Sequence, residues 1–176
     1  MKLKNRIIVT ALIMFACIGC DRLTKNIAKE NLPRHEIISL MHDTVRLQYA
    51  ENTGAFLSFG ANIPPKLRYF VFTILVGIFL CGLLVFQLAS GQLSPTQIAA
   101  MACVLGGGFG NLIDRIVHQG RVFDFLNMGI GSLRTGVFNF ADMSITFGVL
   151  WFLFLTVKNR NRAIPAKDPE VNESDC

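Results

Sequence analysis

Four long apolar runs dominate the chain and alternate with polar segments. Each run is close to the roughly 20 residues that an α-helix needs to cross the hydrocarbon of a bilayer. The second run is the clearest, because none of its 21 residues carries a charged side chain. We therefore predict four membrane-spanning helices, at about residues 7–23, 69–89, 99–117 and 138–157.

Basic residues flank the first and the last run. Lys2, Lys4 and Arg6 precede the first run, and the polar stretch after the last run is rich in Lys and Arg. Positive charge is retained on the cytoplasmic side of a membrane, and four crossings place both termini on the same side. We therefore expect both termini to be cytoplasmic, so that the segment 24–68 and the loop 118–137 face outward.

The outward segment from Glu36 to Phe59 is too polar to span a membrane. Its apolar positions approach the alternation of half-buried strands, broken at Gly54 and Gly60. We predict a small extracytoplasmic β element at the outer ends of the helices. The fold class is thus a mainly α membrane protein with four transmembrane helices and a small β element. A single membrane domain covers residues 1–157, and a cytoplasmic tail covers residues 158–176.

Composition supports this class of protein. Apolar residues make up 52% of the chain and charged residues only 16%, whereas a soluble domain carries about 25% charged residues. The net charge of +5 does not indicate nucleic-acid binding, because the basic residues flank apolar runs and form no basic face. Four of the five cysteines lie within apolar runs, which favours buried thiols over disulfides. Cys17 and Cys20 have the CxxC spacing but lie within an apolar run, and no HExxH spacing is present, so no metal site is predicted.

The N-terminus could be mistaken for a lipoprotein signal peptide. A basic start and an apolar stretch precede Cys17-Ile18-Gly19-Cys20. However, a cysteine three positions before Cys20 fits such a cleavage motif poorly. Cleavage there would also remove a span and place the basic C-terminal stretch outside. We expect the first helix to be retained.

Several charged residues lie at the outward ends of the apolar runs. A charge at mid-span costs about 2.5–3.5 kcal/mol on insertion scales. Taken alone, Arg115 and Lys25 would be explained as interfacial side chains that reach water. Asp124 and Asp142 are shorter and have apolar neighbours on both sides, so a function is favoured for this pair. We expect five charged residues to lie at one depth: Asp21, Asp114, Arg115, Asp124 and Asp142.

Two carboxyl groups that meet in a partly apolar site have a known chemical use. They cannot both ionise easily, so one holds a proton while the other stays charged. The charged group can take a proton from an attacking water, and the protonated group can polarise an amide carbonyl. Such a pair would hydrolyse a peptide without a metal or a covalent nucleophile. The three histidines, His35, His42 and His118, lie near no serine or cysteine in a nucleophile motif.

Five motif blocks follow one another along the chain. They are Asp21-Arg22-Leu23-Thr24-Lys25, Asn52-Thr53-Gly54-Ala55-Phe56, Gly106-Gly107-Gly108-Phe109-Gly110-Asn111-Leu112-Ile113-Asp114-Arg115, Val122-Phe123-Asp124-Phe125 and Phe138-Asn139-Phe140-Ala141-Asp142. In this order, over about residues 5 to 157, they resemble the motifs of the lipoprotein signal peptidase family. One departure is Phe56-Leu57, where many relatives have a second alanine, and this could alter the packing of the outer loop.

The resemblance implies an intramembrane aspartic endopeptidase with Asp124 and Asp142 as its catalytic dyad. The substrate would be a prolipoprotein, cut just before its diacylglyceryl-modified cysteine. The implied location is the bacterial cytoplasmic (inner) membrane, with the active site near the outer face and membrane lipid around it. The resemblance implies no cofactor, and we expect a monomer that binds no nucleic acid. It also implies supporting roles for Asp21, Lys25, Asn52, Gly54, Asn111, Asp114, Arg115, Asn139 and Ala141.

The spacing of the supporting residues fits these roles. Asp21 and Lys25 are four residues apart and can pair if the helix continues. Asn111 and Arg115 share one face of the third span, where Arg115 could bind substrate carbonyls or steady a carboxylate. Asn139 is placed to cap the fourth span.

Two other functions compete with the peptidase. A small transporter or proton channel would use the intramembrane acids as a relay, but these acids cluster near one surface and the chain shows no internal repeat. A non-catalytic membrane scaffold would leave the paired aspartates unexplained. Release of a signal peptide from a lipidated prolipoprotein separates the three alternatives.

Overall fold

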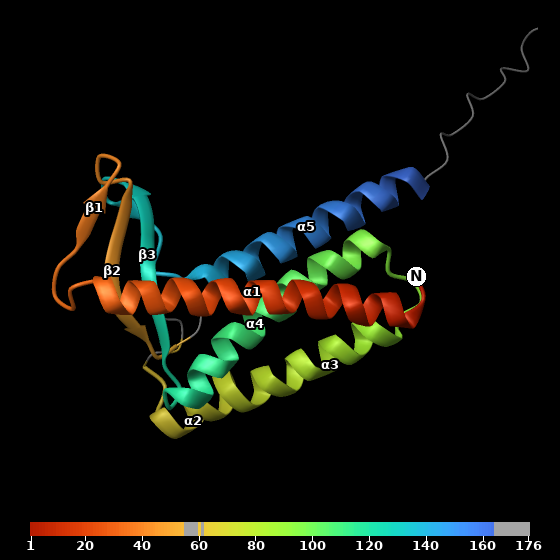
Figure 1. Cartoon of the computed structure of the whole chain (residues 1–176), viewed down its shortest axis with the longest axis horizontal. Coiled ribbons are helices and arrows are strands. Elements are labelled where there is room, and N and C mark those ends of the chain that lie inside the picture. Colours follow the sequence, from red (N-terminus) through yellow and green to blue (C-terminus); the bar gives the residue numbers. More distant parts are fainter. Residues whose placement is uncertain (55–59, 61, 164–176) are drawn as a thin grey trace, which may run out of the picture.

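Helices form most of the molecule, and a small sheet lies across one end of them (Figure 1). The structure, a computed structural model, describes residues 1–54, 60 and 62–163. Within that part of the chain, four helical stretches are long and apolar enough to cross a membrane. The predicted fold class is confirmed. The helical elements are α1 (Leu3–Asn31), α2 (Pro65–Tyr69), the π-helical segment η2 (Phe70–Leu75), α3 (Val76–Ala89), α4 (Pro95–Val117) and α5 (Phe140–Ala163).

The first and last helices are longer than the predicted spans. Helix α1 continues eight residues past the predicted end at residue 23, because the charges of Asp21 and Lys25 are buried and paired and do not end it. Helix α5 continues past residue 157 to Ala163, since the basic residues there are good helix formers. Residues 164–176 of the predicted tail lie outside the described residues.

A proline lies in the first turn of both α2 and α4, the helices that begin the second and third membrane-spanning stretches. Pro65 occupies the first turn of α2 and Pro95 the first turn of α4, where a missing backbone N–H costs nothing. Ser94 caps α4 in a reciprocal capping box with Gln97. Between α2 and α3 the chain winds as the π-helix η2, which adds a bulge to the second span near the sheet.

Helix α4 is the centre of the bundle, and its glycines allow the other helices to approach. Three consecutive glycines face three different helices, and a Cβ on each would meet a neighbour. On Gly106 it would lie 2.6 Å from Cys17 Cβ of α1, and on Gly108 it would lie 2.6 Å from Leu80 of α3. On Gly107 it would overlap the backbone of α5. These glycines therefore allow close helix packing around α4.

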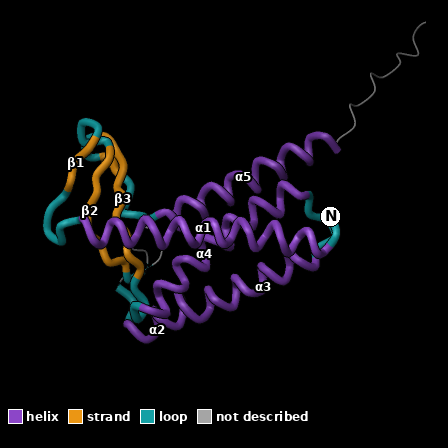
Figure 2. The backbone as a smooth tube through the Cα atoms, viewed as in Figure 1, coloured by secondary structure: helices purple, strands orange, loops and turns teal. Residues whose placement is uncertain are grey.

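The sheet is larger than the predicted β element, and the expectation that residues 118–137 form only a loop is wrong. Its antiparallel order is β1-β2-β3-β4, and β3 and β4 come from that loop (Figure 2). Strand β3 is covered on both faces over most of its length, so it lacks the alternation by which a half-buried strand is recognised. The strands are β1 (Ile38–Leu40), β2 (Val45–Asn52), β3 (Val122–Ile130) and β4 (Leu133–Arg134).

A small core fixes the sheet to the helices. Phe123 and Phe125 of β3 pack with Ala28 near the end of α1, and Tyr49 of β2 packs its ring 4.7 Å from that of Phe123. This contact fixes β3, and with it Asp124, against the end of the bundle where α5 begins (Figure 1).

Candidate active site

Asp142 lies in the first turn of α5 and takes part in capping that helix. The Asn139 side-chain oxygen accepts from the Asp142 backbone N–H at 3.0 Å, and the Asp142 Oδ2 accepts from the Asn139 backbone N–H at 3.1 Å. The two residues thus form a reciprocal capping box with aspartate in the place usually taken by glutamate. The capping predicted for Asn139 is present, and it fixes the Asp142 carboxylate.

Asp124 lies in the middle of the buried part of β3 and is only 1% exposed. Its Oδ2 accepts from Asn52 Nδ2 of β2 at 3.0 Å, and its Oδ1 accepts from Asn139 Nδ2 at 2.6 Å. Burial raises the pKa of Asp124, and the Asp142 carboxylate raises it further, to about 7. Near neutral pH this carboxyl therefore retains a proton for much of the time.

One asparagine joins the two carboxyl groups. Asn139, which is fully buried, donates from its side chain to Asp124 and from its backbone to Asp142. Asn111 of α4 completes the connection, because its Nδ2 donates to Asp142 Oδ1 at 2.8 Å and its Oδ1 accepts from Asn139 Nδ2 at 3.1 Å. Two aspartates that are 18 residues apart in the sequence are thus held in one hydrogen-bonded group.

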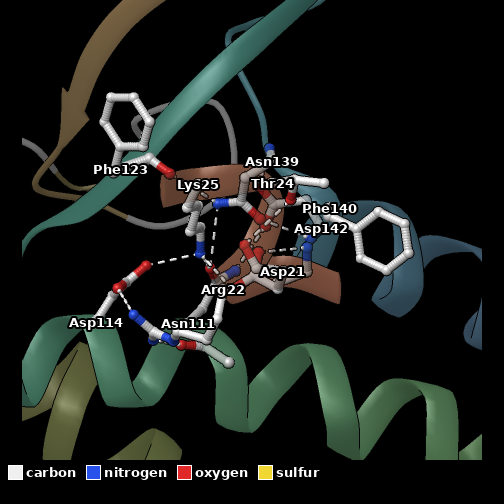
Figure 3. A network of polar contacts seen from close by, with 12 residues as sticks. Asp21, Arg22, Thr24, Lys25, Asn111, Asp114, Phe123, Asn139, Phe140 and Asp142 are labelled. Atoms are coloured by element: carbon white, nitrogen blue, oxygen red, sulfur yellow. Dashed lines mark hydrogen bonds and ion pairs between the residues drawn. The ribbon is translucent and has the colours of Figure 1, made fainter. Parts of the chain in front are cut away.

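A buried lysine lies behind this group (Figure 3). Lys25 is 1% exposed, and its ammonium donates to Asp21 Oδ2 at 2.7 Å, Asp114 Oδ2 at 2.6 Å and Asn111 Oδ1 at 3.1 Å. An ammonium group has three N–H donors, and each has a partner here. The pairing predicted for Asp21 and Lys25 is present.

Lys25 fixes which way the Asn111 amide points. An ammonium can only donate, so Asn111 must present its oxygen to Lys25 and its NH₂ to Asp142. The Asn139 amide is fixed in the same way, because its oxygen accepts a backbone N–H of α5. Both amides consequently point donors at the carboxyl groups, which stabilises negative charge there.

The remaining predicted residues tie further segments to the same group. The Asp21 Oδ1 accepts from the Ala141 backbone N–H at 3.0 Å, which anchors the start of α5 to α1. Arg115 Nη2 donates to the Gly54 carbonyl at 3.0 Å, and the Gly54 N–H donates to Asn52 Oδ1. Arg115 thus binds a backbone carbonyl of its own chain. Phe56 and Leu57, the departure from the family pattern, lie outside the described residues.

The structure brings all the predicted site residues into one network, although their roles in a reaction stay predictions. Sequence reasoning missed Arg22, whose Nη1 donates to Asp114 Oδ1 at 2.5 Å. Arg22 lies within the first motif block, and its position three residues before the paired lysine places it on the same helix face. That spacing was the available signal.

Two mainly apolar grooves meet at Asp142. One has a volume of about 420 Å³ and lies between the second span, α4 and α5, with Phe72, Val76 and Val149 among its lining. The other, of about 430 Å³, lies beside it along α5, next to Met128 and Phe138. Thr146 and Leu150 line both grooves. The carboxyl group is thus reached from two apolar surfaces.

Metal binding finds no support in the part of the chain that the structure describes. There, no three His, Cys, Asp or Glu side chains lie close enough together to hold a metal ion. Each of the four acids of the network has a cation or amide partner. What the arrangement offers is two buried, hydrogen-bonded carboxyl groups that are linked through one amide.

The sequence has relatives of known family. A family model described as signal peptidase (SPase) II matches residues 13–158. A lipoprotein signal peptidase of Chlorobium phaeobacteroides (strain BS1) is 34% identical over 157 residues, which cover 80% of this chain and 95% of the relative. One of Syntrophus aciditrophicus (strain SB) is also 34% identical and covers 76% of this chain and 82% of the relative.

Solved structures share the fold. One described as a bacterial membrane enzyme superposes with a TM-score of 0.76 at 24% identity, covering 91% of this chain and 94% of the other. A second with the same description has a TM-score of 0.69 at 25% identity, covering 85% and 93%. At such identities the likeness supports the arrangement of helices and sheet described above.

Proposed function

The chain belongs to the signal peptidase II family, and we propose that it removes signal peptides from diacylglyceryl-modified prolipoproteins with Asp124 and Asp142 as its catalytic pair. The cut would fall just before the lipidated cysteine. In the proposed topology both termini are cytoplasmic, so the sheet and the site lie at the outer face of the inner membrane. The enzyme would act there as a monomer in the lipid bilayer.

The observation that supports the aspartic mechanism is the joint hold of Asn139 on both carboxyl groups. One group keeps a proton near neutral pH because burial and its charged neighbour disfavour a second negative charge. The ionised group takes a proton from water as the water attacks the scissile carbonyl. The protonated group donates to the carbonyl oxygen and later helps the amine to leave.

The grooves suit a substrate that is part lipid and part peptide. Both are mainly apolar, Asp142 lines both, and they lie next to each other along α5. Burial of acyl and apolar peptide surface in them would contribute about 25 cal/mol per Å². Binding energy remote from the reacting bond would thereby position that bond at the carboxyl pair.

The test is cleavage of a purified diacylglyceryl-modified prolipoprotein. Asp124→Asn and Asp142→Asn should each lower the rate by a factor of at least 10³ while the protein still folds and inserts. Asp43→Asn is the matched control, because Asp43 is an exposed acid on the same sheet with no contact to the pair. If either active-site variant cleaves near the parent rate, the dyad is misassigned.

A proton relay is the alternative that this assay also addresses. Figure 3 shows Asp21, Asp114 and Asp142 close together, and Asn139 links Asp124 to Asp142, so these acids form one cluster and not a path across the membrane. A channel would leave the lipidated prolipoprotein intact and would acidify proteoliposomes under a proton gradient.

A further inference from the structure

Arg22 is a cation of the buried network that the proposed mechanism does not use. Its Nη1 donates to Asp114 Oδ1 at 2.5 Å, and its Nη2 donates to the Gly110 carbonyl at 2.9 Å. Asp114 is fully buried, whereas the Arg22 side chain is 31% exposed. Figure 3 shows Arg22 and Lys25 reaching Asp114 from the same helix. Each oxygen of this carboxylate thus has its own cation.

The charges of the network balance only when Arg22 is counted. Behind the catalytic pair lie two carboxylates, Asp21 and Asp114, and two cations, Lys25 and Arg22. Without Arg22 the two carboxylates would share Lys25 alone and leave one net negative charge. That charge would be separated from Asp142 only by Lys25 and the Asn111 amide.

We propose that Arg22 is a positioning residue of the peptidase, which neutralises Asp114 so that Lys25 holds the Asn111 amide in place and the catalytic pair faces a neutral network. This inference rests on the proposed function of Asp124 and Asp142. Arg22 sets the pH range in which the pair works, and it does so without touching the substrate. The charge is what matters, so a lysine at this position serves where a neutral residue does not.

Removal of the Arg22 charge should move the pH profile of cleavage in one direction. A net negative charge behind the pair makes ionisation of its carboxyl groups harder, so both limbs of the pH profile move to higher pH. Across a partly buried path the expected displacement is about 0.5 to 1 pH unit, which is about a 3- to 10-fold loss of kcat/KM on the acid side. The charged or titratable side chains around Asp114 and the pair are Asp21, Arg22 and Lys25 of α1, Arg115 of α4, His118 after it, Asp124 of β3 and Asp142 of α5.

The experiment measures kcat/KM for a lipidated prolipoprotein between pH 5 and 9. Arg22→Gln removes the charge and Arg22→Lys keeps it. Arg46→Gln is the matched control, because Arg46 has the same 31% exposure and the same 2.5 Å pairing with an aspartate, Asp43, away from the network. His118, whose Nδ1 lies 3.7 Å from Asp114 Oδ1, is replaced by glutamine in a parallel series so that its own titration is excluded.

We expect the pH profile of kcat/KM to move to higher pH for Arg22→Gln. The profiles of Arg22→Lys and Arg46→Gln should match that of the parent. An unchanged acid limb in Arg22→Gln, or equal profiles for the glutamine and lysine variants, would overturn the proposal. If Arg22→Gln does not fold, the double variant Arg22→Gln with Asp114→Asn decides, because it removes one positive and one negative charge. The acid side of its pH profile must then match that of the parent. Failure of the proposed function looks different, because Asp142→Asn would then cleave normally whatever Arg22 does.

Discussion

Replacement of Lys25 by methionine tests the buried network most directly. The lysine is 1% exposed and contacts two carboxylates that are themselves fully buried. Asp114 would keep Arg22, but Asp21 would keep only the Ala141 backbone N–H. Loss of one partner from a buried ion pair costs about 3–5 kcal/mol, because a charge is left uncompensated.

Thermal unfolding of the purified protein in detergent measures this cost. For a chain of this size, about 3–5 kcal/mol corresponds to a fall in Tm of about 6–20 °C. Lys29→Met, one turn further along α1, is the control, since the partly exposed Lys29 ammonium lies only over the Phe123 ring, 5.2 Å from its centroid, and should cost about 1 kcal/mol or less. A second change, Asp21→Asn, should recover half or more of the Lys25→Met loss. A Tm of Lys25→Met within 2 °C of the parent would refute the reasoning.

Three further predictions concern the same site. Gly107→Ala should lower Tm and cleavage by displacing α5, at a cost of about 1–3 kcal/mol, whereas Gly82→Ala, where a Cβ meets nothing within 4 Å, should leave both unchanged in the same assays. Cleavage should decline above about pH 7 in a rate-against-pH series, because Asp124, with its pKa raised to about 7, then loses the proton that the pair needs; a rate that is flat to pH 9 would contradict this. The folded state binds that proton more tightly than the unfolded chain does, so the free energy of unfolding should fall as pH rises from about 4 to 7. Asp124→Asn should therefore raise Tm at pH 8 more than at pH 4.5. Equal changes in Tm at the two pH values would argue against this prediction.

The four spans could be predicted because each leaves a local signal, whereas most of the site residues are implied by the family resemblance and their roles stay predictions. Apolar runs are local, and short acids such as Asp142 among apolar neighbours are conspicuous at a helix end. The i,i+4 spacing of Asp21 and Lys25 likewise needs no partner from elsewhere in the chain.

Features that depend on distant partners could not be predicted. Strand β3 is buried on both faces over most of its length, so the alternation that marks a half-buried strand is absent and residues 118–137 look like a loop. The charges after residue 23 predict an end of α1 there, because charged residues normally face solvent, whereas α4 supplies the partners that bury them. The role of Arg22 cannot be predicted for the same reason, because the carboxylate that it binds, Asp114, comes from α4.

The network draws on α1, β2, α4, β3 and α5, and Asn139 and Asp142 enter it only when α5 begins. On the proposed function, the catalytic pair can form only once the last helix is in place, because a growing chain that lacks α5 carries Asp124 without Asp142.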